Sequence, residues 1–375
     1  MTDINARGFA RSKLWFRCSC FLLFFVAAAA SFNGFYDKYR LLESGTVNPE
    51  MQQTFEAMVD GTAPRPFVYR QLLPMTADWM DARLAAMFPA QMERWTSREG
   101  KGLPAGAGWI DSPIVQRPRY LLRYCIVYGL VFLSAWASVF FAWLLSMRAG
   151  FHPAAAVLAA VGMILLMPWL LTGGGYFYDY PELCFMLLAA WMAASMDWWW
   201  VIPVAALATW NKESFFFFLP TLYPLIRARA SLFQALAAVG ALNLVSGVVY
   251  LLLRLRYAHN PGATVEVHIL DQVRVLLHPG AYLLSPEKTY GILFVRGLYP
   301  ILLAFLVWTL WLEWKNLPRV FRQHAMFAAV INIPLYLLFC EPGELRNLSM
   351  LYVTLVLLMA ACWSEWLRLQ ANTGQ

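Results

Sequence analysis

Long apolar segments separated by short polar stretches recur along the whole 375-residue chain. Most are close to the roughly 20 residues that an α-helix needs to cross the hydrocarbon layer of a membrane. The segments are continuous rather than alternating, so they do not fit the strands of a membrane β-barrel. The pattern therefore predicts an all-α protein, a polytopic transmembrane helix bundle.

About ten spans are predicted. They cover residues 15–35, 124–147, 152–171, 183–196, 198–210, 214–226, 232–253, 292–314, 325–339 and 348–367. The stretch 183–226 departs from the pattern, because its last two spans are only about 13 residues each. Pro203, Pro220 and Pro224 favour short, tilted or broken helices there.

Basic residues set the orientation. Four of them, Arg7, Arg11, Lys13 and Arg17, precede the first apolar segment. Positively charged flanks stay on the cytoplasmic side, and nearly all later short loops on that side are also basic. Both termini are therefore predicted to be cytoplasmic. The first apolar segment is predicted to be a retained anchor rather than a cleaved signal, because many spans follow it.

These assignments divide the chain into seven parts. They are a cytoplasmic tail (1–14), a first span (15–35), an extracytoplasmic loop (36–123), a transmembrane bundle (124–253), a second extracytoplasmic loop (254–291), C-terminal spans (292–367) and a cytoplasmic tail (368–375). The first loop is too long for a simple connector. Within it, residues 67–88 have the mixed apolar and charged pattern of a helix on the membrane surface, and residues 100–108 have the glycines of a flexible loop. Alternatively, the loop only caps the bundle.

Composition supports the membrane assignment. Apolar residues make up 60% of the chain and charged residues only 14%, which excludes an ordinary soluble domain. The net charge of +7 comes from Lys and Arg scattered over loops and helix ends, as topology signals are. The lipid bilayer is therefore the expected partner, and nucleic acid is not.

The cysteines and histidines do not form a metal-binding pattern. Six cysteines lie mostly within apolar segments without a CxxC pair, and five histidines are dispersed. Inert buried thiols are the expected outcome. No metal site and no cofactor is predicted from these residues.

Three polar islands interrupt the apolar sequence, at 173–182 (GGGYFYDYPE), 211–214 (NKES) and 340–347 (CEPGELRN). Ionisable groups beside membrane spans are costly and are usually retained for function. In the predicted topology all three islands lie on the extracytoplasmic face, together with the long first loop. We therefore expect a functional site on that face.

Carboxylates on this face are candidates for acid–base chemistry. Asp37 follows the first span, where a partly desolvated carboxylate could be a general base. Alternatively it is a solvated loop residue paired with Lys38 or Arg40. Asp179 is the second candidate. Its neighbouring glycines allow close approach of a ligand.

Tyr178 and Glu182 are candidate substrate-binding residues in the same island. Tyrosine can stack on a sugar or bind its hydroxyls. Glu182 follows Pro181, however, so it is alternatively a favourable charge at the start of a helix.

Basic residues on the same face are candidates for binding an anion. Lys212 could hold a phosphate as a point charge while Glu213 orients it, although the two could instead form a buried ion pair. Arg346 could bind phosphate oxygens with its planar fork, or serve as an anchor with a local ion pair. Arg70 of the first loop adds a possible anion contact.

Glu341 and Glu344 lie beside Arg346 just before the last span. They complete the set of predicted substrate-binding residues.

The order of these motifs resembles the GT-C superfamily of integral membrane glycosyltransferases, either its PMT- and ArnT-like branch or short bacterial relatives, which RPFVYRQLLP and the E-x-R motif also resemble. Asp37 occupies the place of an acidic residue near the start of the first loop, and YFYDYPELCF resembles the second acidic motif. ATWNKESFFFFLP is similar in placement to a lysine motif, but has Glu213 and Ser214 where that branch favours Gly-Pro. Arg346 matches a late arginine without its aromatic and proline neighbours.

The resemblance implies a transferase in a bacterial inner membrane. It would transfer a sugar from a polyprenyl-phosphate carrier to a glycan, lipid or protein acceptor on the periplasmic face. Asp37 would be the base and Asp179 its assistant, while Lys212, Arg346 and Arg70 would hold the departing phosphate. No metal is required, although the paired acids leave a divalent ion open. The alternatives are a transporter or flippase of a polar lipid or solute, and a non-catalytic component of envelope polysaccharide assembly.

Overall fold

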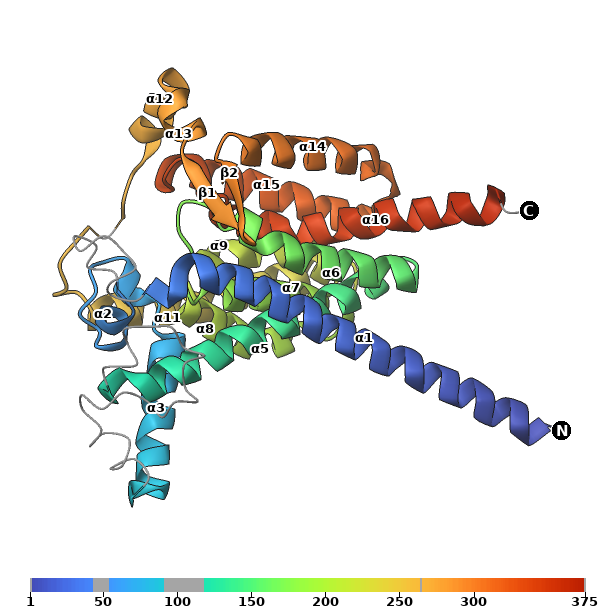
Figure 1. The fold of residues 1–375 in the computed structure, drawn as a ribbon, viewed down its shortest axis with the longest axis horizontal. Helices are drawn as coiled ribbons and strands as arrows, with labels where there is room; N and C mark the ends of the chain where they lie inside the picture. Colours follow the sequence, from blue (N-terminus) through green and yellow to red (C-terminus); the bar gives the residue numbers. More distant parts are fainter. Residues whose placement is uncertain (1, 43–53, 91–117, 264, 374–375) are drawn as a thin grey trace.

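The computed structural model describes residues 2–42, 54–90, 118–263 and 265–373 (Figure 1). The predicted flexible loop at 100–108 lies outside these ranges. The described chain is almost entirely helical. Its longer helices are α1 (Thr2–Tyr39), α3 (Leu72–Met87), α5 (Pro118–Arg148), α6 (Pro153–Leu170), α7 (Asp179–Ser195), α8 (Val201–Asn211), α11 (Leu232–Arg256), α14 (Leu298–Leu312), α15 (Arg319–Phe339) and α16 (Ser349–Thr373). The shorter helices are α2 (Phe55–Val59), α9 (Ser214–Phe218), α10 (Tyr223–Arg227), α12 (Ile269–Leu277) and α13 (Pro279–Leu283).

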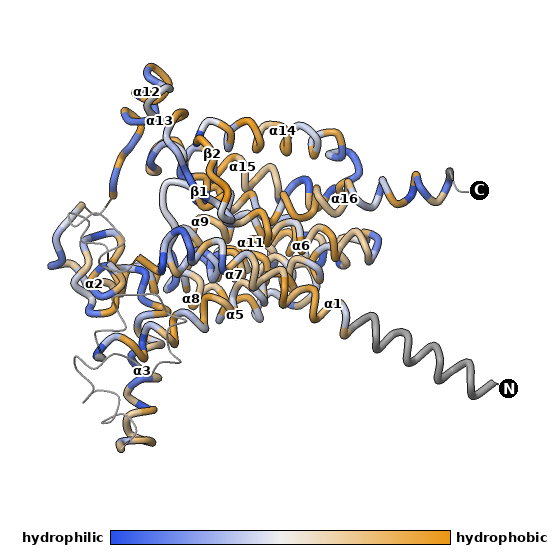
Figure 2. Tube along the Cα trace, in the orientation of Figure 1, coloured by the Kyte–Doolittle hydropathy of each residue, from blue (hydrophilic) through white to orange (hydrophobic). Residues whose placement is uncertain are grey.

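Five helices in the described ranges are long and apolar enough to cross a membrane. They lie within residues 18–42, 119–148, 153–170, 232–256 and 345–372. The hydrophobic middle of the bundle is visible in Figure 2, with more polar residues toward its ends. An all-α membrane protein, as predicted, is therefore the class of this chain.

Small residues allow the central helices to pack closely. Ala155, Ala156, Ala159 and Ala160 of α6 are buried, and α6 contacts α1, α5 and α16. Without a hydrophobic driving force in lipid, such close backbone packing is the main source of helix association. Helix α7 packs against α5 and α8, which places its N-terminus inside the bundle.

The stretch 198–226 is broken, as predicted for its proline-rich sequence. Helix α8 ends at Asn211, and Lys212 has an extended backbone (φ −158°, ψ 131°) before α9 begins at Ser214. A 3₁₀ turn containing Pro220 then separates α9 from α10. This break leaves Lys212 and Glu213 at a helix interruption beside the core.

Two of the boundaries that differ from the sequence prediction change how a residue or an element is assigned. Helix α1 continues through Tyr39, so Asp37 lies in its last turn and not in a loop. Its extension is stabilised by packing of Phe32 and Phe35, which are buried. Residues predicted to begin a span at 292 instead form a strand, β2 (Ile292–Val295), paired antiparallel with β1 (Pro286–Thr289).

The hairpin follows from its two-residue turn. Tyr290 and Gly291 both have positive φ, 53° and 77°, as a tight turn between twisted strands requires. The strand 292–295 is apolar and is soon followed by the apolar helix α14, so hydrophobicity alone does not distinguish it from the start of a membrane helix.

The predicted surface helix at 67–88 is present as a short 3₁₀ turn (Phe67–Tyr69) followed by α3. Helix α3 runs across one end of the bundle and contacts α5 (Figure 1). It buries Leu73 and Ala77 and exposes Trp79. Both chain termini lie at the other end of the bundle.

Candidate functional site

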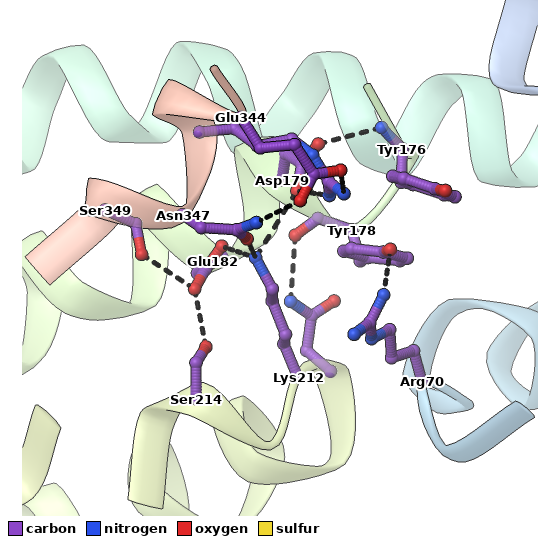
Figure 3. A network of polar contacts seen from close by, with 12 residues as sticks. Arg70, Tyr176, Tyr178, Asp179, Glu182, Lys212, Ser214, Glu344, Asn347 and Ser349 are labelled. Carbon is purple, nitrogen blue, oxygen red and sulfur yellow. Dashed lines mark hydrogen bonds and ion pairs between the residues drawn. The ribbon is translucent and has the colours of Figure 1, made fainter. Parts of the chain in front are cut away.

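The three polar islands of the sequence meet in space (Figure 3). Asp179 begins α7, Lys212 occupies the break between α8 and α9, and Arg346 lies in a 3₁₀ turn (Leu345–Leu348) before α16. Gly173 and Gly174, with φ of 71° and 144°, allow the sharp turn that leads to Asp179. Each charged group is thus supplied by a helix end, and all three are buried.

Lys212 is the cation at the centre of this cluster. Its Nζ lies 2.7 Å from Oε2 of Glu182 and 3.7 Å from Oδ1 of Asp179. It also donates a hydrogen bond of 3.3 Å to Oδ1 of Asn347. The side chain of Lys212 is only 4% exposed. A buried ammonium group is tolerated because these acceptors replace its hydration.

Glu182 lies in the first turn of α7, as the alternative from the sequence expected, and its side chain also joins this network. Its Oε1 accepts hydrogen bonds from Ser214 at 2.6 Å and from Ser349 at 2.9 Å. The carboxylate therefore ties α7 to α9 and α16, with Lys212 as its counter-ion. By contrast, it is Asp179 that accepts a backbone hydrogen bond, from Tyr176 at 2.8 Å.

The Arg346 guanidinium is held in place by its neighbours, but two of its nitrogen atoms make no hydrogen bond within the described residues. Its Nη2 donates to Oε1 of Glu344 at 2.8 Å, and its guanidinium lies 4.4 Å from the centre of the Tyr176 ring. Nη1 is 3.6 Å from Oδ1 of Asp179, a charge contact too long for a hydrogen bond. The Nε and Nη1 atoms are buried and make no hydrogen bond within the described residues. Two guanidinium donors are therefore left without a hydrogen bond in the described part of the chain, although Nη1 keeps its charge contact with Asp179.

Glu213 pairs with Arg70 rather than with its neighbour Lys212. Arg70 donates to both carboxylate oxygens of Glu213, at 2.8 and 3.3 Å, and to the hydroxyl of Tyr178. Lys212 has an extended backbone and Glu213 a helical one, and their side chains reach different elements: Lys212 contacts Glu182 of α7, and Glu213 contacts Arg70. The coulombic attraction of Glu213 outweighs burial and raises the pKa of Arg70. The self-neutralising Lys212–Glu213 pair, one of the alternatives from the sequence, is not formed.

Stacked aromatic rings support the two arginines. Tyr176 and Tyr178 lie 4.9 Å apart and nearly parallel, and Phe67 stacks on Tyr176 at 5.7 Å. The Arg70 guanidinium lies 4.6 Å from the centre of the Tyr178 ring. Burial raises the pKa of Tyr176 to about 12, so this ring is uncharged at neutral pH. The stack therefore provides a rigid wall with cations on its faces.

A cavity of about 270 Å³ adjoins this network. Its polar part contains Glu182, Lys212, Ser214, Arg346, Asn347 and Ser349. A second part is apolar and is formed by Phe217 of α9, Leu335 and Phe339 of α15, and Met350 of α16. Exposed residues, including Glu266 and Glu341, mark its opening to the surface.

Most of the residues selected from the sequence converge on this cavity. The lining includes Arg70, Glu182, Lys212, Glu213, Glu341, Glu344 and Arg346. Tyr178 and Asp179 contact that set without lining the cavity. Asp37 is not among the lining residues. Its carboxylate is half exposed and lies 3.7 Å from Lys288 Nζ on β1.

Several lining residues were not selected from the sequence. Tyr250 and Arg254 come from α11, and His268 precedes α12. Arg254 lies over Tyr250, 4.5 Å from the ring centre, which is the i,i+4 spacing of one helix face. That spacing is a readable signal, but arginines at the end of a span are ordinarily topology determinants. Asn347 and Ser349 carry no charge and gave no signal of their own.

Glu341 differs from the other carboxylates around the cavity. Glu182, Glu213 and Glu344 each form a salt bridge with Lys212, Arg70 or Arg346. Glu341 forms none within the described residues. Partial desolvation by the surrounding chain, and then the charge of Glu344, raise the pKa of Glu341 above its ordinary value. Such a carboxylate is a stronger proton acceptor than a salt-bridged one.

No group of three or more His, Cys, Asp or Glu side chains in the described ranges is arranged to hold a metal ion. Comparison with protein-family models gives no match, and comparison with curated proteins gives none. The site is therefore interpreted from its own geometry.

Proposed function

We propose that this chain is an integral membrane glycosyltransferase. It transfers a sugar from a polyprenyl-phosphate carrier to a glycan, lipid or protein hydroxyl at the extracytoplasmic end of the bundle. We place this protein in a bacterial inner membrane, with about ten helical segments in the bilayer and both termini in the cytoplasm. The proposal rests on the resemblance in motif order and on the geometry around Arg346.

The single observation that supports it most is that Nε and Nη1 of Arg346 are buried and make no hydrogen bond within the described residues. A buried donor without an acceptor costs about 1–3 kcal/mol, and a phosphate oxygen would satisfy it. Charge develops on that oxygen as the bond between sugar and phosphate breaks. Fixed donors aimed at developing charge are among the most effective catalytic devices. Lys212, which is paired with Glu182, also lines the cavity and is a second cation near the phosphate.

The cavity dimensions suit the reacting part of such a donor. A volume of about 270 Å³ is close to the lower end of the usual range for ligand pockets, about 300–1,000 Å³. It can hold a monosaccharide phosphate but not a polyprenyl chain. The aromatic residues Phe67, Tyr69 and Tyr336 in the lining provide surfaces for a sugar ring. The apolar part between α9, α15 and α16 is suited to the first isoprene units of the carrier.

Glu341 is the proton acceptor in this proposal, in place of Asp37. The acceptor hydroxyl attacks the anomeric carbon of the sugar and gives its proton to Glu341. The bond from the anomeric carbon to the phosphate oxygen breaks, and its electron pair stays on the carrier phosphate. Arg346 and Lys212 then neutralise that phosphate. The chemistry needs no further reactant.

Variants at Glu341 and Arg346 test the proposal. The assay measures release of free carrier from synthetic polyprenyl-phosphate monosaccharides, using full-length protein in vesicles with a membrane extract as acceptor. Glu341→Gln is expected to slow transfer at least about 100-fold while donor binding is retained. Arg346→Lys keeps the charge but loses the planar fork, and is expected to weaken donor binding about 10-fold.

Asp37→Asn is the matched control, because Asp37 does not line the cavity. It is expected to keep the transfer rate of the unmodified protein. If Asp37→Asn abolished transfer and Glu341→Gln did not, the base would be Asp37. If the unmodified protein released carrier from no donor, the glycosyltransferase proposal itself would fail.

A further inference from the structure

Helix α12 exposes an apolar face that no described part of the chain covers. Leu270, Val273, Leu276 and Leu277 have relative exposures of 69%, 45%, 79% and 69%. At 100° per residue these four positions fall within an arc of about 120°. A nine-residue helix with so concentrated an apolar face is strongly amphipathic.

The opposite side of α12 is attached to the bundle by polar contacts. The backbone N–H of His268 donates to the carbonyl of Leu338 at 2.9 Å, and Gln272 donates to the carbonyl of Cys340 at 3.0 Å. Leu338 is in the last turn of α15, and Cys340 follows that helix directly. The helix is therefore held in one orientation, with its apolar face directed away from these contacts.

The apolar surface continues beyond α12. Leu284 after α13 is 74% exposed, and Leu293 on β2 is 71% exposed. The next helix, α14, exposes Ile301, Phe305 and Trp308, as a helix surrounded by lipid does. In Figure 1, α12 and α13 project from one side of the bundle, while α3 projects on the opposite side at the same end. The Leu283 carbonyl at the end of α13 accepts a hydrogen bond of 2.7 Å from Gly297, directly before α14.

A basic hollow adjoins this surface. It is lined by Arg274, His278 and Arg296, together with Tyr282 and Ser285, and no carboxylate is among its lining residues. Arg274 is 76% exposed, with Asp271 at 3.0 Å, and Arg296 pairs with Glu287 at 3.2 Å. Cations next to an apolar helix face are the arrangement that binds anionic lipid headgroups.

We propose that α12, α13 and β2 form a membrane-interface element. Its apolar face inserts among the acyl chains of the outer leaflet, and the basic hollow binds the headgroup of an anionic phospholipid. This inference stands independently of the proposed transferase activity. The element is also connected to the cavity, because the lining residues Val265, Glu266 and His268 directly precede α12. Anchoring of α12 in lipid steadies that wall.

Photolabelling from the lipid phase tests this proposal. Full-length protein is reconstituted in phosphatidylcholine vesicles containing phosphatidylglycerol with a diazirine near the headgroup end of one acyl chain, and labelled peptides are identified by mass spectrometry. Peptides covering 269–284 are expected to be labelled. Peptides from the lipid-facing side of α14 serve as the positive control, and the buried helix α7 as the negative control. Labelled α14 without labelled 269–284 would overturn the proposal.

The hollow is tested by charge. Arg274→Gln is expected to reduce labelling of 269–284 by the phosphatidylglycerol probe about fivefold, which is the effect of one basic residue near an anionic surface. Labelling by an equivalent phosphatidylcholine probe should stay unchanged. Arg368→Gln, at the far end of the bundle, is the control and should change neither. Equal labelling by both probes in the unmodified protein would contradict a site for anionic lipid. Cross-links between α12 helices of two copies in place of lipid labelling would show that a second chain covers this face.

Discussion

Buried charges in this protein are compensated in pairs that join different elements. Lys212 reaches Glu182 of α7, and Arg70 reaches Glu213 at the start of α9. Asp179 is shared between Lys212 and Arg346. At the residue scale, the site is a nearly neutral network in which Arg346 alone among these cations retains two buried donors without a hydrogen bond.

Removal of one partner should therefore be costly. Lys212→Met leaves Glu182 without its counter-ion, and the expected loss of stability is about 3–5 kcal/mol. The double variant Lys212→Met with Glu182→Gln should recover part of this loss. Thermal unfolding of the detergent-solubilised protein measures both, with the exposed Lys315→Met as control. Equal losses in the single and double variants would show that the pair is not coupled.

Glu341 should lower stability at neutral pH. Its raised pKa means that the folded state binds the proton more tightly than the unfolded state. The resulting stabilisation is complete below the ordinary pKa of 4.5 and is lost as pH rises through the folded-state value. Glu341→Gln should therefore raise the unfolding temperature at about pH 7.5 but not at about pH 4. The gain should be below about 1 kcal/mol, because solvent screens a partly exposed carboxylate.

The opposite result, a lower unfolding temperature at neutral pH only, would mean that the charged form of Glu341 is stabilised by a partner. That outcome would remove the reason for choosing it as the base.

The sequence identified the residue types of the site better than their partners. Asp179, Lys212 and Arg346 could be selected because each is an ionisable residue within apolar sequence. A charge in such a position is costly and is usually retained for function. Pairing depends on which helix ends meet, so the Glu213–Arg70 pair could not be predicted. Asp37 was selected by its place after the first span, and the longer α1 carries it to a half-exposed position beside Lys288.

At the scale of elements, the β-hairpin is fastened to the bundle by one buried lysine. Lys38 Nζ lies 2.6 Å from Glu287 and 3.1 Å from Thr289 on β1. It also donates to the carbonyls of Pro168, in the last turn of α6, and Leu171, directly after that helix. The side chain is 6% exposed. The same residue thus holds the hairpin and the start of the turn that leads to Asp179.

Lys38→Met is expected to loosen the hairpin. Amide hydrogen exchange in 286–295 should become about tenfold faster, because opening no longer breaks these buried hydrogen bonds. Lys288→Met is the control, since the Lys288–Asp37 pair is exposed and contributes little. Unchanged exchange in Lys38→Met would assign the attachment to other contacts, such as the Tyr290 hydroxyl on the Leu165 carbonyl.

Elements were predictable where apolar length or proline content decided them. The long spans and the break within 198–226 follow directly from the sequence. The hairpin could not be predicted in this way. Its strand Ile292–Val295 precedes an apolar helix, and only the Tyr290–Gly291 turn distinguishes a strand from the start of that helix. Helix α12 was likewise hidden within a loop assignment, although its amphipathic period was present in the sequence.

At the scale of the whole molecule, the proposed site lies at one end of the bundle. Both termini lie at the end opposite α2 and α3, and the elements α3 and α12 project sideways near the cavity end (Figure 1). A bundle with this arrangement can accept a lipid-linked substrate from the membrane and a polar acceptor from the aqueous side.

The basic flanks of the spans and the position of both termini opposite the cavity end together predict cytoplasmic termini and an extracytoplasmic cavity. Epitope tags at the two termini should be cleaved by protease only after cells are opened, because the proposed orientation puts both tags in the cytoplasm. A protease site inserted near Gly262, in an exposed connection before α12, should be cleaved in intact spheroplasts. Cleavage of the tags in intact spheroplasts would reverse the orientation and place the cavity in the cytoplasm.

The fate of a sugar on its carrier, in sealed vesicles containing the purified protein, tests the central claim most directly. Polyprenyl-phosphate monosaccharide labelled in the sugar is supplied with an acceptor extract, and both the covalent state and the leaflet of the label are measured. The account predicts that label leaves the carrier for a new covalent product, and that Glu341→Gln prevents this. Intact labelled carrier that changes leaflet without losing its sugar would contradict it and indicate a flippase.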